Sequence, residues 1–265
     1  MTRIIAIVNQ KGGVGKTTTT VNLATALAAI GKKTLIIDLD PQGNASTGLG
    51  IEQRQRAVSS YHVLIGSSSV DDAVLPTIIP CLFIVPSNID LSAAELELVQ
   101  VEAREGRLKA ALDVATFDFD YVLIDCPPSL GLVTMNALVA SQSVFIPLQC
   151  EFYALEGLSH LLKTVQLIQK RLNPVLDICG VVLTMYDKRN KLTEHIESDV
   201  RGFLKDTVFK TVIPRNVRLS EAPSHGKPAI VYDMTCSGSQ AYIMLAKEMI
   251  KREQVRQACI DAKVA

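Results

Sequence analysis

Two lysines stand five positions apart in the stretch QKGGVGKTTTT, residues 10–20, which directly follows the first apolar run of the chain. Gly15, Lys16 and Thr17 match the end of the pattern Gly-x4-Gly-Lys-Ser/Thr, whose backbone amides cradle a polyphosphate. Gln10 stands where the first glycine of the pattern is expected, and Lys11 is an additional cation beside it. The stretch therefore predicts phosphate binding by a loop with an unexplained second lysine.

The residues of this loop have separable tasks in binding a nucleoside triphosphate. The glycines let the backbone turn its N–H groups toward the phosphates, and the helix pattern over 16–30 adds the dipole of its N-terminus. Lys16 would reach the β- and γ-phosphates, and the Thr17 hydroxyl would bind Mg²⁺. The predicted nucleotide-binding residues of the loop are Lys11, Gly12, Gly13, Val14, Gly15, Lys16, Thr17 and Thr18.

Aspartates follow two further apolar runs. Asp38 and Asp40 end the stretch LIIDLD, and Asp125 ends YVLID. An aspartate at the end of a strand is typical of the Walker B position, where it orients Mg²⁺ and its water. Aspartates after strands also form turns and helix caps, but the nearby phosphate loop favours a magnesium role for Asp125.

The elements that must position these residues alternate along the chain. Apolar runs predict strands at 3–9, 33–38, 82–87, 121–126, 143–149, 178–185 and 208–214, and amphipathic patterns predict helices at 16–30, 103–114, 153–171 and 192–205. Strands that are apolar on both faces and alternate with helices predict an α/β fold with a doubly wound, mostly parallel sheet. We expect a single P-loop domain over 1–253 and a frayed helical extension over 254–265. Ligands should bind where the strands end.

Composition favours a soluble, cytoplasmic protein. The 265 residues are 48% hydrophobic, and 27 basic residues balance 27 acidic ones. No secretory signal pattern is visible, and the six cysteines form no CxxC pair, which predicts reduced and mostly buried thiols. Residues 126–150 carry no charge, but Pro127, Pro128 and Pro147 interrupt them, so a loop, a buried helix and a buried strand explain the stretch better than a membrane span.

Several separate blocks of the sequence resemble one family. KGGVGKTT resembles the deviant Walker A motif of the MinD/ParA group of P-loop ATPases. DLDPQGNAS, DCPPSLG, PLQCEFYALEGL and IPRNVRLSEAPSHGKP are similar to the ParA/Soj subfamily of chromosome- and plasmid-partitioning ATPases, and the resemblance covers about residues 1–253. It implies an enzyme that hydrolyses ATP with Mg²⁺.

The resemblance also implies roles for individual residues, with Lys11, Lys16 and Asp40 as the catalytic set. Lys11 would reach across an ATP-sandwich homodimer to the phosphates held by the other subunit, where a cation stabilises developing charge. Asp40 would orient the attacking water, and Asp125 would hold the groups that coordinate Mg²⁺. The residues expected near adenine are Asp187, Pro214 and Asn216.

Other members of the superfamily do different work. Iron–sulfur carriers need paired cysteines, which are absent here. A MinD-like positioning ATPase at a membrane remains the alternative, although the tail 247–265 has no aromatic residue and would bind bilayers poorly, so we expect no stable membrane association. A nucleotide-dependent scaffold that uses hydrolysis as a timer is a further alternative.

Local charge favours DNA as the partner. Between Lys163 and Lys227 the chain has twelve Lys and Arg against seven Asp and Glu. Without interleaved aromatic residues, such a surface suits the phosphates of nonspecific double-stranded DNA. By resemblance, the DNA-binding residues are Arg189, Arg218 and Lys227, in a nucleoid-associated dimer whose slow hydrolysis a ParB-type centromere-binding protein stimulates.

Overall fold

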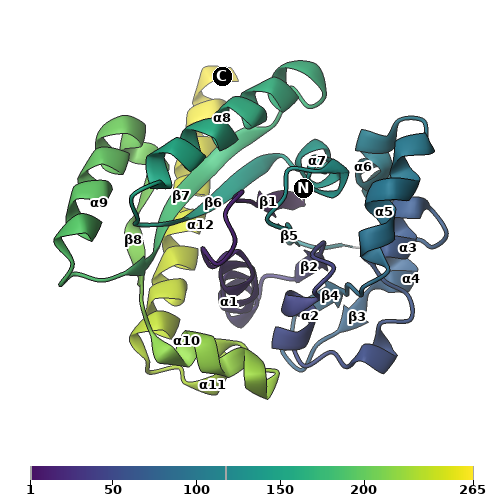
Figure 1. The fold of residues 1–265 in the computed structure, drawn as a ribbon, viewed down its shortest axis with the longest axis horizontal. Coiled ribbons are helices and arrows are strands. Elements are labelled where there is room, and N and C mark those ends of the chain that lie inside the picture. Colours follow the sequence, from purple (N-terminus) through teal and green to yellow (C-terminus); the bar gives the residue numbers. More distant parts are fainter. Residues whose placement is uncertain (1, 117, 265) are drawn as a thin grey trace.

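One eight-stranded sheet forms the centre of the computed structural model, in the order β3-β4-β2-β5-β1-β6-β7-β8 (Figure 1). The structure describes residues 2–116 and 118–264, and only the backbone of 257 and 259–264. The strands are β1 (Arg3–Ile7), β2 (Thr34–Asp38), β3 (Leu75–Pro76), β4 (Leu82–Val85), β5 (Tyr121–Asp125), β6 (Ser143–Gln149), β7 (Asp177–Tyr186) and β8 (Val208–Pro214). Only the β3–β4 pair is antiparallel in the part of the chain described.

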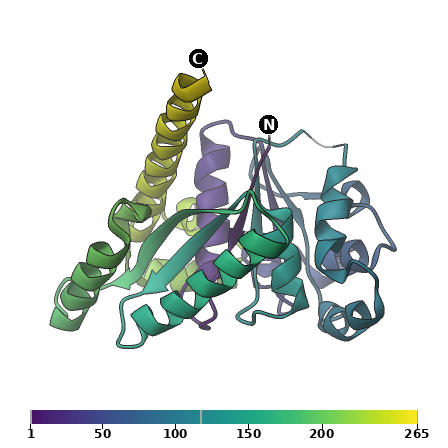
Figure 2. The same cartoon turned by 90° about the horizontal axis from the view of Figure 1, so that it is seen from above.

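Helices cover both faces of the sheet (Figure 2). One face packs against α3 (Ser60–Ile65), α5 (Leu91–Glu97), α6 (Arg107–Asp113), α7 (Leu132–Ala140), α8 (Ala154–Arg171) and α9 (Lys191–Leu204). The other face packs against α1 (Lys16–Ala29), α2 (Asn44–Gly48), α10 (Val217–Glu221), α11 (Ala229–Tyr232) and α12 (Ser237–Val264), while the short α4 (Val70–Ala73) lies beside α3. The doubly wound α/β fold expected from the sequence is confirmed.

The predicted elements agree with the structure except at their ends. All seven expected strands and all four expected helices form, but α6 begins at Arg107 because residues 104–106 form a 3₁₀ turn. The uncharged stretch 126–150 holds a loop, α7 and β6, as expected. Within the described residues, no helix is long and apolar enough to cross a membrane. Helix α12 continues to Val264 and so runs through most of the expected extension.

The central strands owe their position to residues that are apolar on both faces. Every residue of β2 and of β5 is buried, and each buried aliphatic side chain of this kind contributes roughly 1.5–3 kcal/mol. Helix α1 is buried on most of its surface because α12 packs against it. The loop between β1 and α1 therefore joins a strand whose last three residues are buried to a helix that is buried on most of its surface.

Cysteine burial matches the expectation in part. The described thiols are all free: Cys126 and Cys150 are buried, Cys179 and Cys236 are partly buried, and Cys81 is exposed. The side chain of Cys259 lies outside the described residues.

Candidate nucleotide and magnesium site

The loop between β1 and α1 encloses a cavity at the carboxyl edge of the sheet. Gly13 and Gly15 have φ of 75° and 86°, a left-handed conformation that favours glycine. From β7, which is two strands along the sheet from β1, the Thr184 hydroxyl donates to the Val14 carbonyl at 2.8 Å and holds the loop against the sheet. The cavity measures about 250 Å³, and its lining from the loop is Gly12, Gly13, Gly15, Lys16, Thr17 and Thr18.

Lys16 turns its ammonium group inward, onto the loop. Its Nζ donates to the Lys11 carbonyl at 3.0 Å, and the residue is only 7% exposed. Burial lowers the pKa of Lys16, and the charge of Asp125 opposes this shift. A cation with little hydration inside a ring of glycine amides is well suited to a phosphate anion, so the residues present fit the expected nucleotide.

The aspartate predicted at the Walker B position lies directly behind the loop. Asp125 is fully buried, and its two oxygens accept from Thr17 Oγ1 at 2.7 Å and from Thr20 Oγ1 at 2.9 Å. Burial raises the pKa of Asp125, with the charge of Asp38 as the second cause. Mg²⁺ commonly takes one or two protein ligands and completes its shell with phosphate oxygens and water. The Thr17 hydroxyl, oriented by Asp125, fits that pattern.

The two aspartates after β2 have different positions. Asp38 is fully buried and accepts from Ser46 N at 2.9 Å, Ser46 Oγ at 2.7 Å and Asp40 N at 3.2 Å. Asp40 lines the phosphate cavity opposite the loop. Asp38 therefore fixes the turn that presents Asp40, and the structure places the predicted catalytic carboxylate in the same cavity as Lys16.

Lys11 lies outside this cavity. Its ammonium forms an ion pair with Glu151, in the connection between β6 and α8, and its side chain is 51% exposed. It lines a second hollow together with Gln10 and Tyr153. Of the two lysines in the loop, one faces the chain's own phosphate cavity and the other faces the surface.

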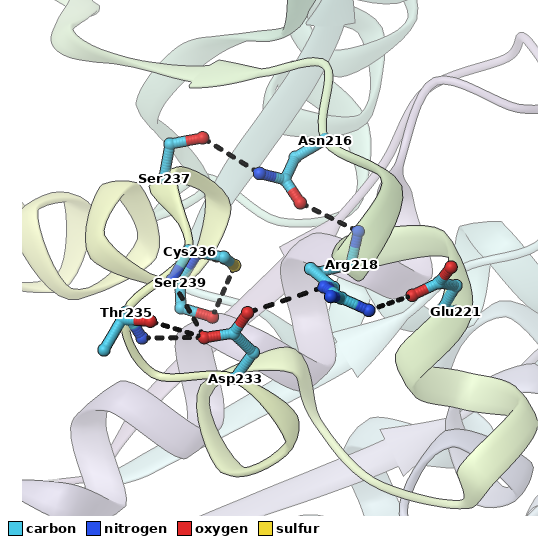
Figure 3. Close-up of polar contacts among 8 residues, drawn as sticks. All are labelled: Asn216, Arg218, Glu221, Asp233, Thr235, Cys236, Ser237 and Ser239. Atoms are coloured by element: carbon cyan, nitrogen blue, oxygen red, sulfur yellow. Dashed lines mark hydrogen bonds and ion pairs between the residues drawn. The ribbon is translucent and has the colours of Figure 1, made fainter.

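The residues expected near adenine meet at the carboxyl ends of β7 and β8, where Tyr186 pairs with Pro214. Asp187 accepts from Arg189 Nε at 3.0 Å and Nη2 at 2.9 Å. Asn216 caps α10 by accepting from Arg218 N at 2.8 Å, and its Nδ2 donates to Ser237 Oγ at 2.9 Å (Figure 3). The Asn216 side chain is therefore already engaged within the chain.

The predicted DNA-binding arginines are exposed but paired with carboxylates. Arg189 forms the two-pronged contact with Asp187 described above. Arg218 lies between Glu221, at 2.8 Å, and Asp233, at 3.5 Å (Figure 3). Lys227 is exposed and lines a hollow of about 280 Å³ next to Thr17 and Thr18. The structure thus places Lys227 beside the nucleotide site and couples Arg189 to the expected adenine region.

Some site residues were not predicted from the sequence. Thr20 holds the second oxygen of Asp125, and Asn44, Pro128 and Met185 line the phosphate cavity. The run of threonines after Lys16 was a signal for Thr20, since a helix places residues 16 and 20 on one face. Met185 has a φ of 49°, which no sequence pattern indicated.

Known proteins are similar to this chain in both sequence and fold. A family model described as an AAA domain matches residues 2–178. The chromosome partitioning protein ParA of Caulobacter vibrioides is 56% identical over 97% of both chains, and the sporulation initiation inhibitor protein Soj of Bacillus subtilis is 56% identical over 94% of this chain and 98% of its own.

A solved structure extends the likeness to the backbone. The protein from Mycobacterium smegmatis named cobyrinic acid a,c-diamide synthase, with a bound ATP analogue and magnesium, is 36% identical, with a TM-score of 0.83 over 96% of each chain. Identity to the ParA and Soj proteins is higher and also spans nearly the whole chain. A P-loop bearing a second lysine, an aspartate on each of two neighbouring strands and this similarity agree: the chain belongs to the ParA/Soj family of chromosome-partitioning ATPases.

Proposed function

We propose that this chain is an ATP-dependent DNA-partitioning ATPase, whose ATP-bound dimer binds nonspecific double-stranded DNA and is released by hydrolysis. The observation that carries the proposal is the division of labour between the two lysines of the loop. Lys16 is buried in the chain's own phosphate cavity, whereas Lys11 is half exposed at the surface beside it. Lys11 is thus available to a second copy.

The residues around the cavity divide the work of hydrolysis. Mg²⁺ and ATP, when bound, supply the metal charge and the phosphoanhydride bond that is hydrolysed. Lys16 and the loop amides would neutralise phosphate charge, the Thr17 hydroxyl held by Asp125 would bind the metal, and Asp40 would orient water. Asp187, Pro214 and the backbone near Asn216 contact the base. The backbone of Asn216 is proposed rather than its side chain, because that side chain is occupied as a helix cap.

Dimerisation follows from the position of Lys11. A lysine that reaches phosphate only on a second copy makes ATP binding and dimerisation favour each other. Breaking the ion pair between Lys11 and Glu151 costs little free energy, because exposed ion pairs contribute about 0–1 kcal/mol.

The DNA surface combines Arg189, Arg218 and Lys227. Arg189 and Arg218 are balanced by neighbouring carboxylates within one chain, which suits weak DNA binding by a monomer and stronger binding when a dimer doubles the surface. A ParB-type protein bound at centromere-like sites stimulates hydrolysis and so frees the dimer, in the cytoplasm on the nucleoid.

A DNA-binding assay on the purified protein tests this proposal. With ATP, the protein should shift unrelated duplexes equally, and the log–log salt slope should fall by about 0.9 for each DNA phosphate that Arg218→Glu no longer neutralises. Lys109→Glu is the matched control, because it also reverses an exposed, carboxylate-paired charge, but on α6 and outside the basic segment 163–227. Binding to anionic liposomes without binding to DNA would instead support the membrane-positioning alternative.

A further inference from the structure

A pair of exposed aromatic side chains lies beside the phosphate loop. Phe152 and Tyr153 are 76% and 66% exposed, and their rings meet edge to face at a centroid distance of 5.1 Å. An aromatic side chain can bury about 150–250 Å² when a partner covers it, and such residues are enriched at the centres of protein interfaces. The other exposed phenylalanine of the described residues is Phe203, on α9.

The pair is attached to the loop by defined contacts. Glu151, the preceding residue, forms the ion pair with Lys11. Asn9 accepts from Lys11 N at 3.0 Å and donates to the Pro147 carbonyl at 2.7 Å, which joins the start of the loop to β6. The carbonyls of Glu151 and Tyr153 accept from Ala154 N and Gly157 N in the first turn of α8. These contacts anchor the backbone on both sides of Phe152, which lowers the entropy cost of a contact.

An indentation of suitable size lies next to the pair on the same surface. The hollow beside Lys11 measures about 270 Å³. Its lining combines the apolar side chains of Val14, Leu148, Ala154 and Leu158 and the ring of Tyr153 with polar side chains that include Lys11 and Glu151. A projecting aromatic ring and a partly apolar hollow on one face are the parts of a self-complementary contact, in which each copy supplies both.

We propose that Phe152 and Tyr153 are the apolar anchors of the contact between two copies of this chain, with Phe152 of each copy seated in the hollow beside Lys11 of the other. The inference rests on the proposed function, which brings the phosphate loops of two copies together. It adds an energetic reason for the dimer: exposed ion pairs contribute little, so aromatic burial next to Lys11 supplies the stability.

Alanine variants and a matched control test the anchors. The Phe152→Ala/Tyr153→Ala variant should raise the dimer dissociation constant, measured by sedimentation with a nonhydrolysable ATP analogue and Mg²⁺, by about tenfold or more. Phe203→Ala should leave it unchanged, because α9 runs back from the carboxyl end of β7 and places Phe203 near the opposite end of the sheet. Analogue binding by the monomer, measured at low protein concentration, should stay within twofold of wild type in both variants.

The outcomes separate the anchors from the proposed function. If the wild-type protein does not dimerise with the analogue, the proposed function fails and the anchors fail with it. If the wild type dimerises and the double variant dimerises equally well, only the anchors are wrong. If the double variant dimerises normally but loses stimulation by a ParB-type protein, the pair serves that partner and the inference is overturned.

A fluorescence reporter gives an independent readout, since the chain contains no tryptophan. Phe152→Trp should show a blue-shifted emission with the analogue, and the shift should disappear on dilution below the dimer dissociation constant. Phe203→Trp should show no shift. An unchanged Phe152→Trp spectrum under conditions where sedimentation shows the dimer would overturn the proposal.

Discussion

Burial gives the site residues properties that their types alone do not reveal. Lys16 and Asp125 could be selected from the motifs, because the loop pattern and the strand-end aspartate are local in sequence. The 7% exposure of Lys16 and the two threonine contacts of Asp125 could not be predicted from the motifs, since they depend on how β1, β5 and α1 pack. The supporting role of Asp38 was equally hidden, because its contact with Ser46 forms only after α2 folds back.

Asp40→Ala should separate ATP binding from ATP hydrolysis. Lys16, Thr17 and the loop amides remain, so ATP should bind and hold the dimer, while hydrolysis should fall by about 10²–10⁴-fold through loss of the group that orients water. Phosphate release and equilibrium binding measure the two properties. A variant that hydrolyses ATP within threefold of wild type would remove Asp40 from the mechanism.

The Asp187–Arg189 pair gives a pH prediction at a single carboxyl group. Hydrogen bonds from Arg189 lower the pKa of Asp187 to about 2, from an ordinary value of 3.8. Because the pKa is lower in the folded state, the pair favours folding above pH 3.8, and this contribution disappears as the pH falls through about 2. In an NMR titration, Arg189→Ala should return the pKa toward 3.8, whereas Arg218→Ala should not change it. An unaltered Asp187 pKa in Arg189→Ala would contradict the assignment.

At the scale of elements, the hydrophobic pattern of the sequence predicted the long helices and the apolar strands. The seven expected strands pair in one sheet with most of their apolar residues buried, and the phosphate loop follows β1 as the pattern predicted. The strand β3 has two residues, one of them Pro76, and carries no pattern from which it could be predicted. Met185 at the end of β7 adopts a positive φ, which a residue with a side chain rarely does and which the sequence therefore could not predict.

The edge strand β8 depends on a carboxylate from α12. Glu248 accepts from Lys210 N at 2.8 Å and from Thr211 N at 2.9 Å, and so pairs N–H groups of the last strand in the sheet. Glu248→Ala should lower the free energy of unfolding by about 1–2 kcal/mol. Lys247→Ala, on the exposed side of the same helix, is the control and should have almost no effect.

The destabilisation by Glu248→Ala should depend on pH. Burial alone would raise the pKa of Glu248, but the hydrogen bonds from Lys210 and Thr211 outweigh it, and the pKa lies below 4.5. The stabilisation is therefore present above pH 4.5 and is lost as the pH falls through the lower folded value. Denaturant unfolding should show the two proteins converging in acid, and a difference that grows there would contradict this role.

At the scale of the whole molecule, the role proposed for Lys11 requires a working unit of two chains. Lys11→Ala should still bind ATP, because Lys16, Thr17 and the loop amides remain, but it should not hydrolyse it. Mixed with Lys16→Ala, it should recover activity, since in a heterodimer the nucleotide on the Lys11→Ala subunit faces an intact Lys11. Crosslinking establishes that heterodimers form. Crosslinked heterodimers that show no recovery would mean that Lys11 does not act across the interface.

Sedimentation velocity with a fluorescent duplex of arbitrary sequence tests the central claim most directly. The protein, at 28.8 kDa per chain, should sediment as a dimer with ATP and Mg²⁺ and carry the duplex with it, and it should sediment as a monomer without DNA when ADP replaces ATP. The chain would then be a nucleotide-dependent switch whose ATP-bound and ADP-bound states differ in their affinity for DNA. Equal association with the duplex in ATP and ADP, or a monomer in both, would contradict the account.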